Sequence, residues 1–155
     1  DRLVGIDLSS EMIKAAMNRN TYDELEVNDI VGFLSNRAGE FDLILAADVF
    51  VYVGDLSETF LLVSAALRPD GLFAFSVEAA EETWKGVMPV DGYHLNPSRR
   101  YSHTLDYVRQ LAARQHFSEV SAEIATLRTQ AGNDVRGWIV VFAKSQKPDA
   151  GKNSE

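Results

Sequence analysis

Short apolar runs and amphipathic segments alternate along most of this chain. The run at residues 3–8 has no polar alternation, which is typical of a strand buried on both faces of a parallel sheet. Residues 10–19 then carry apolar side chains at helical spacing, which predicts a helix capped by Ser9 or Ser10. Residues 41–47 form another apolar run, interrupted only by Asp42, and predict a central strand.

The rest of the chain continues this alternation. The pattern predicts a weaker strand at 22–28, helices after Asp29 and Asp55 and around 105–112, and strands at 72–77, 117–127 and 136–144. Strands that alternate with helices predict an α/β fold, with a doubly wound and mostly parallel sheet. Since no helix separates the last two strands, they are expected to pair as an antiparallel C-terminal hairpin.

Two segments have no clear periodicity. Residues 78–100 contain prolines and a glycine, which is typical of a lid or binding loop. Residues 145–155 are polar and predict a disordered tail. The pattern therefore predicts one domain over residues 1–144, followed by this tail.

Composition excludes several classes of function. The 15 Lys and Arg residues against 23 Asp and Glu give a formal charge of −8, which argues against nucleic acid as a partner. No apolar run is long enough for a membrane span. The chain has no cysteine, which agrees with a cytoplasmic location, and its three scattered histidines predict no metal site.

Four motifs resemble those of the class I methyltransferases, which have a Rossmann-like fold and use S-adenosylmethionine. Residues 4–12 are similar to the family's second strand, its acidic residue and the next helix. Asn28 and Asp29 are similar to the acidic position after the third strand. Residues 41–48 resemble the fourth-strand motif, and residues 67–73 resemble the helix–turn–strand motif that follows.

The chain departs from the family at its beginning. The family's first strand and glycine-rich turn normally lie directly before the position of Leu3, and the sequence contains no Gly-x-Gly. We therefore expect an N-terminal truncation, with weakened or abolished cofactor binding. A sheet without its middle strand would expose apolar edges, which predicts a tendency to form a homodimer or to aggregate.

The resemblance implies a set of cofactor-binding residues. The Asp7 carboxylate would accept hydrogen bonds from both ribose hydroxyls at a strand's carboxyl end. Leu8 and Met12 would contact the adenosine portion, although Met12 also suits the core face of a helix. Asp29 would accept a hydrogen bond from the adenine amine, unless it serves only as a helix cap. Ile30 would supply a backbone amide and an apolar wall.

Asp48 follows a buried strand and would lie beside the methyl donor, holding the cofactor's ammonium group or meeting the substrate. Substrate contacts are expected from nearby aromatic side chains and from the irregular segment. These candidates are Phe50, Tyr52, Tyr93, Arg100 and Tyr101, with core packing as the alternative for the aromatics and a surface position for Arg100.

His94 and His103 are the candidate general bases, because imidazole titrates near neutral pH. The predicted function is S-adenosylmethionine-dependent methyl transfer to a small-molecule or protein acceptor. Two alternatives stay open: a non-catalytic Rossmann-like module that binds a partner, and a nicotinamide-dependent oxidoreductase, which also places an acid on ribose.

Overall fold

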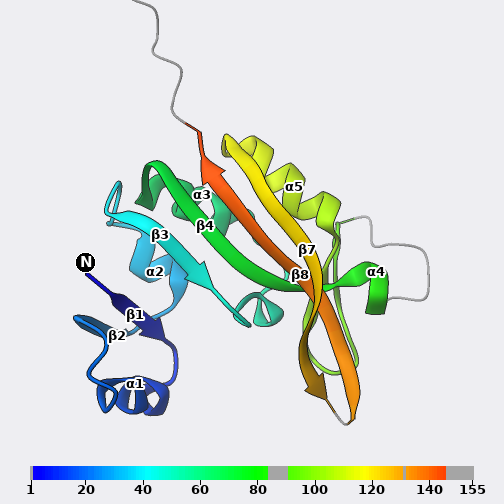
Figure 1. Ribbon diagram of the computed structural model, residues 1–155, viewed down its shortest axis with the longest axis horizontal. Helices are drawn as coiled ribbons and strands as arrows, with labels where there is room; N and C mark the ends of the chain where they lie inside the picture. The colour runs from blue at the N-terminus through cyan, green and yellow to red at the C-terminus, as the bar shows by residue number, and fades with distance from the viewer. Residues whose placement is uncertain (1, 84–90, 131, 146–155) are drawn as a thin grey trace, which may run out of the picture.

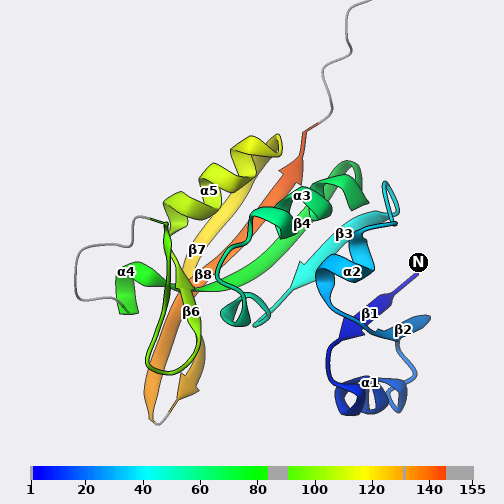
Figure 2. The ribbon, with the colours of Figure 1, turned by 180° about the vertical axis from the view of Figure 1, so that it is seen from behind.

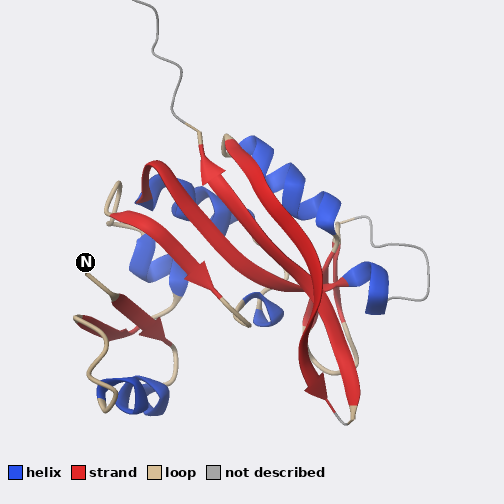
Figure 3. Ribbon diagram, in the orientation of Figure 1, coloured by secondary structure: helices blue, strands red, loops and turns tan. Residues whose placement is uncertain are grey.

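The computed structural model describes residues 2–83, 91–130 and 132–145, and the predicted tail lies outside these ranges except for its first residue. Strands and helices alternate, and two long strands end the described chain (Figures 1 and 3). The strands are β1 (Val4–Asp7), β2 (Glu24–Val27), β3 (Phe41–Ala46), β4 (Leu67–Ala79), β5 (Tyr93–Leu95), β6 (Tyr101–His103), β7 (Phe117–Gln130) and β8 (Asn133–Lys144). The helices are α1 (Ser10–Met17), α2 (Ile30–Leu34), α3 (Ser57–Ala66), α4 (Ala80–Thr83) and α5 (Leu105–Arg114), with the 3-10 turn η1 (Phe50–Tyr52).

The strands form two sheets. β1 and β2 pair in parallel. The larger sheet has the order β5-β6-β4-β8-β7, and β3 also pairs with β4. β3 and β6 run parallel to β4, whereas β8 lies antiparallel between β4 and β7. This arrangement confirms the predicted α/β fold and its C-terminal hairpin.

Three of the helices begin at a capping residue, whose side chain accepts a hydrogen bond from a backbone amide of the first turn. The Ser9 hydroxyl accepts a hydrogen bond from the Met12 amide at 3.3 Å. The Asp29 carboxylate accepts one from the Gly32 amide at 2.8 Å, and the Thr104 side chain caps α5 in the same way. These contacts confirm the caps predicted for α1 and α2 and fix where each helix leaves its strand.

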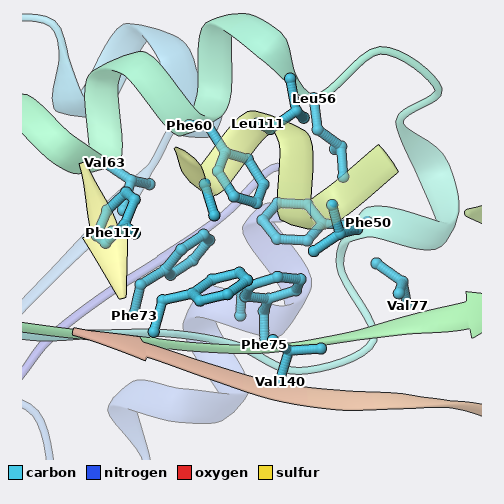
Figure 4. Close-up of a cluster of buried hydrophobic side chains, with 14 of the residues drawn as sticks. Phe50, Leu56, Phe60, Val63, Phe73, Phe75, Val77, Leu111, Phe117 and Val140 are labelled. Atoms are coloured by element: carbon cyan, nitrogen blue, oxygen red, sulfur yellow. The ribbon is translucent and has the colours of Figure 1, made fainter. Parts of the chain in front are cut away.

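The hydrophobic core lies between the larger sheet and helices α3 and α5, which cover one of its faces (Figure 2). Phe60 of α3 is fully buried at its centre. Its ring meets Phe73 and Phe75 of β4 edge-on, at centroid distances of 5.4 and 5.6 Å. It also meets Phe117 at 6.4 Å (Figure 4), and it meets Phe142 at 6.3 Å. Edge-to-face packing of this kind adds to the stabilisation from apolar burial.

The opposite face of the larger sheet carries exposed apolar side chains. Leu43 and Leu45 of β3 are 55% and 69% exposed, and Ile139 of β8 is 46% exposed. Figure 1 shows this face, over which no helix of the described residues lies. The prediction that residues 41–47 form a central strand is wrong for the described chain, because β3 pairs there with β4 alone.

The prediction of a strand buried on both faces at residues 3–8 is also wrong. The residues of β1 are partly or fully exposed, and Leu8 is 75% exposed. The physical reason is that β1 pairs only with β2 among the described residues. An unalternating apolar run predicts the strand correctly, but it does not show what covers each of the strand's sides.

Ion pairs join the small β1–β2 sheet to the rest of the molecule at the amino ends of its strands. Arg2 pairs with Glu24 and also with Glu40, at 2.8 Å, just before β3. Arg37 pairs with the same two carboxylates, at 2.8 and 3.1 Å. The hydrogen bonds from Arg2 and Arg37 lower the pKa of Glu24. Because these groups are solvated, the network orients the two sheets more than it stabilises them.

The irregular segment predicted at residues 78–100 contains more regular structure than expected. α4 begins it, and β5 pairs with β6 in a hairpin whose second strand lies against β4 at Glu78. Strands of three residues are too short for a visible alternation, which is why the pattern did not predict them. Residues 84–90 of this segment lie outside the described residues.

The helix–turn–strand motif at residues 67–73 also differs from the prediction. β4 already begins at Leu67, and the Pro69–Gly71 stretch forms an irregularity within the strand, where Asp70 has a φ of 63°. No helix of the described residues is long and apolar enough to cross a bilayer.

The packing of Phe60 predicts the effect of its removal. Phe60→Ala should lower the free energy of unfolding by about 3–5 kcal/mol, because four rings lose contacts and a cavity forms. Leu61→Ala is the matched control on the next residue, which is 54% exposed, and should change stability by about 0.5 kcal/mol or less. Urea denaturation followed by circular dichroism measures both. Equal losses in the two variants would contradict this description of the core.

Candidate functional site

Three aspartates lie at or just after the carboxyl ends of parallel strands. Asp7 is the last residue of β1, Asp29 follows β2 by two residues, and Asp48 follows β3 by two residues. All three are exposed. The arrowheads of β1 and β3 point the same way in both ribbon views (Figures 1 and 2). Carboxyl ends of strands are where open α/β sheets bind ligands.

Asp7 and Asp29 each use one carboxylate oxygen locally. The Oδ1 atom of Asp7 accepts a hydrogen bond from the Ser9 amide at 2.7 Å, and Oδ1 of Asp29 accepts from the Gly32 amide at 2.8 Å. The second oxygen of each carboxylate makes no hydrogen bond within the described residues. One oxygen thus fixes the side chain, while the other stays available for a ligand.

Apolar side chains lie next to these carboxylates in the chain. Leu8 is 75% exposed and Met12 is 58% exposed, and Ile30 is half-buried after Asp29. Large apolar side chains that face solvent beside polar groups are typical of ligand-binding surfaces. Met12 was open to a core role in the sequence, and its exposure leaves it outside the core.

Asp48 is held in a conformation that few residues adopt. Its φ is 56°, and its amide donates a hydrogen bond to the Ser76 hydroxyl at 2.9 Å. Its carboxylate lies between two guanidinium groups: Arg128 donates to Oδ1 at 2.9 Å, and Arg100 lies 3.9 Å from Oδ2. A strained aspartate fixed on both sides is frequent at functional sites.

Arg128 connects Asp48 to a buried carboxylate, Glu78, at the end of β4. Glu78 is 3% exposed and pairs with Arg128. It lies opposite Gly137 in the β4–β8 ladder. At Gly137 a Cβ would come within 2.3 Å of the carbonyl oxygen of Val77, so only glycine allows the strands to approach here.

Four of the five predicted substrate residues are at least partly exposed, and the fifth is buried. Tyr52 is 65% exposed, and the Arg100 guanidinium lies 5.6 Å above its ring. Tyr93 and Tyr101 are half-buried, with their rings 6.2 Å apart. The prediction that Phe50 lines a substrate pocket is wrong, because Phe50 is fully buried and belongs to the hydrophobic core.

The two candidate bases are placed differently. His94 is half-buried on β5. His103 is fully buried, and its Nε2 atom lies 2.9 Å from the Gly54 carbonyl oxygen, to which it donates. Its ring centroid lies 6.1 Å from that of Tyr93 and 6.0 Å from that of Tyr107. His103 as a base that meets the substrate is therefore a correction to the sequence analysis, since a fully buried ring bound to backbone lacks access to a ligand.

Three residues of this site, Glu78, Ser76 and Arg128, are not among the candidates that the sequence predicts. Glu78 follows the apolar run at residues 72–77, the pattern that pointed to Asp48, so this signal was present in the sequence. No local feature of the sequence points to Arg128, because its role comes from its pairing with Glu78 and Asp48, which lie 50 and 80 positions earlier in the chain. No group of three side chains suited to a metal ion lies together in the part of the chain that the structure describes.

Comparison with known proteins agrees with this geometry. The model of a methyltransferase domain family matches residues 1–73. A SAM-dependent methyltransferase from Methanosarcina mazei superposes with a TM-score of 0.71 at 19% identity, over 93% of this chain and 82% of that one. None of the curated proteins matches the sequence.

Two further solved structures show how widely this fold is used. The N-methyltransferase NodS from Bradyrhizobium japonicum, in complex with S-adenosylhomocysteine, has a TM-score of 0.66 at 19% identity, over 94% of this chain and 67% of that one. The [4+2]-cyclase SpnF has a TM-score of 0.71 at 14% identity, over 93% and 67%. A fold shared with a cyclase does not define the reaction by itself.

A methyltransferase-domain model matches the first 73 residues, slightly less than half of the chain, and the fold of the SAM-dependent methyltransferases extends over nearly all of it. Both findings agree with the class I methyltransferases, whose motifs the sequence resembles.

The burial of His103 predicts a pH dependence of stability. Burial lowers the pKa of His103 from its usual value of 6.5, and hydrogen bonds to the Gly54 and Val53 carbonyls only partly oppose this. The unfolded chain therefore takes up a proton first as the pH falls, and stability is lost below about pH 6.5, by up to about 1.4 kcal/mol for each pH unit.

Urea denaturation at pH 7.5 and pH 5.5 measures this loss. His103→Gln should show a smaller loss on acidification than the unchanged chain, because the titrating group is gone. His116→Gln, at an exposed histidine, is the matched control and should keep the full loss. If His103→Gln keeps it too, then His103 is not the group responsible.

Proposed function

We propose that this chain binds S-adenosylmethionine at the carboxyl ends of β1, β2 and β3 and transfers its methyl group to a small-molecule or protein acceptor. The observation that carries the proposal is the placement of Asp7, Asp29 and Asp48, one exposed carboxylate at each of these strand ends. The family match and the solved structures of similar fold support the same cofactor.

The residues present fit the parts of this cofactor. The unbonded oxygen of Asp7 suits the ribose hydroxyls, and that of Asp29 suits the adenine amine. Leu8, Met12 and Ile30 supply apolar surface for the adenine ring. Asp48 suits the ammonium group of the methionine portion, because its carboxylate is exposed beside the end of β3.

The chain's own part in methyl transfer is positioning. The cofactor supplies an activated methyl group when it is bound, and the acceptor attacks that carbon in line with the leaving sulfur. The protein must hold the two reactants in this line and keep water away. His94 is the remaining candidate base on the β5–β6 hairpin, and an acceptor that is already a good nucleophile needs none.

Calorimetric titration of the 155-residue chain with S-adenosylhomocysteine tests the proposal. Asp7→Asn should weaken binding by about ten-fold to about a hundred-fold, because a charge-assisted hydrogen bond to the ribose is lost. Asn keeps an oxygen for the Ser9 amide, so the turn should stay intact.

Asp42→Asn removes the same charge from an exposed position on β3 and is the matched control, with binding expected to stay unchanged. A parallel titration with NADH separates the nicotinamide-dependent alternative. Binding of NADH in place of S-adenosylhomocysteine, or equal effects of the two substitutions, would contradict the proposed cofactor site.

A further inference from the structure

Two arginines beside Asp48 each have a buried side-chain nitrogen atom without a partner, and a third such nitrogen belongs to a residue that lines the neighbouring cleft. Nδ2 of Asn96, Nη1 of Arg100 and Nε of Arg128 are buried and make no hydrogen bond within residues 2–83, 91–130 and 132–145. Buried donors are nearly always paired in folded proteins, and an unpaired one is destabilising by about 1–3 kcal/mol. Unpaired donors at one place indicate a ligand that brings oxygen atoms.

The two arginines share a single carboxylate. Arg128 donates to Oδ1 of Asp48 at 2.9 Å, while Nη1 of Arg100 lies 3.9 Å from Oδ2, which is too long for a hydrogen bond. Both guanidinium groups are therefore within 4 Å of the same side chain and close to one another. Arg128 has a second partner in Glu78, but Arg100 pairs with no other carboxylate among the described residues.

Arg100 is held in place although its charge is poorly compensated. Its guanidinium lies 5.6 Å above the Tyr52 ring, which orients the planar group. When Asp48 binds the cofactor's ammonium group, as proposed above, three cationic groups share its one negative charge, so the charge of Arg100 is compensated even less. A planar guanidinium with free donors matches a carboxylate, which it binds through two parallel hydrogen bonds.

We infer that Arg100 and Arg128 bind a carboxylate group of the methyl acceptor, directly beside the methyl-donor position. This rests on the proposed function and names the substrate class: a small acceptor that carries one carboxylate. The site lies next to a cleft of about 430 Å³. Glu78, the partner of Arg128, lines this cleft together with Asn96. Glu82, Asp134 and Arg136 line the same cleft, with Arg136 3.9 Å from the Glu82 carboxylate. The acidic side chains outnumber the basic one there and would disfavour an acceptor with further negative charges.

Three probes that differ only in their head group test the inference on the 155-residue chain. Benzoate is anionic, benzamide is neutral and benzylamine is cationic. Calorimetry measures their binding, and the arginine Nε–H signals in nitrogen-15 NMR spectra report which guanidinium responds. Benzoate should bind and shift the Arg128 and Arg100 signals, and the other two should bind at least about ten-fold more weakly.

Substitutions locate the site. Arg100→Gln should weaken benzoate binding by about ten-fold or more, and Arg100→Lys should weaken it less, because lysine keeps the charge and loses the fork. Arg99→Gln is the matched control: it removes the same charge from the neighbouring exposed residue and should leave binding unchanged. Thermal unfolding of each variant checks that the fold is intact.

Several results would overturn the inference: no response to benzoate, equal binding of benzylamine, or equal effects of the Arg99 and Arg100 substitutions. The outcome is separate from the cofactor test. If S-adenosylhomocysteine binds but benzoate does not, the carboxylate site alone is wrong. If benzoate binds and NADH binds in place of S-adenosylhomocysteine, the proposed cofactor fails while the carboxylate site stands.

Discussion

The interaction of Arg128 with Glu78 and Asp48 determines how the functional end of this molecule is built. Glu78 is almost fully buried at the end of β4, where a lone carboxylate would be strongly destabilising. Arg128 supplies the opposite charge from β7, far away in the sequence. The same guanidinium reaches Asp48 beyond β3. One side chain thus joins the end of the terminal hairpin to the ends of two parallel strands.

This connection holds the carboxyl ends of the strands in place, where the candidate site lies. The aromatic core around Phe60 holds β4, β7 and β8 together on the side of α3 and α5 (Figure 4). Near the carboxyl ends of the strands, charge pairing and the glycine at position 137 take over from apolar packing. Asp48 is held there in a left-handed conformation by Ser76 and Arg128, so its carboxylate is already positioned before any ligand arrives.

Much of the fold could be predicted from the sequence because its signals are local. The caps at Ser9 and Asp29 and the unbroken apolar runs mark elements whose causes lie within a few residues. The three-residue strands β5 and β6 could not be predicted, since their partners, not their own pattern, define them. The exposure of Leu43 and Leu45 on β3 follows from the lack of a described helix over that face of the sheet, which no pattern within the strand records.

Only part of the candidate site could be predicted: its three aspartates and Arg100 were candidates from the sequence, but Glu78 and Arg128 were not. Asp7, Asp29 and Asp48 follow strands and could be found by position alone, whereas Arg128 is defined by contacts over 50 and 80 residues. Phe50 and His103 were predicted to lie in the site, but both are buried in the interior. Both types of residue suit a binding site, but the fold places them in its interior, where an aromatic ring packs and a neutral imidazole binds a backbone carbonyl.

A double-mutant cycle on Arg128 and Glu78 measures the central interaction most directly. Arg128→Met alone should lower the free energy of unfolding by about 3–5 kcal/mol, because it leaves the Glu78 carboxylate buried without a partner. Adding Glu78→Leu should recover most of that loss, since no unpaired charge is left. Losses that simply add, or an Arg128→Met variant as stable as the unchanged chain, would show that this arginine does not hold the hairpin to the strand ends.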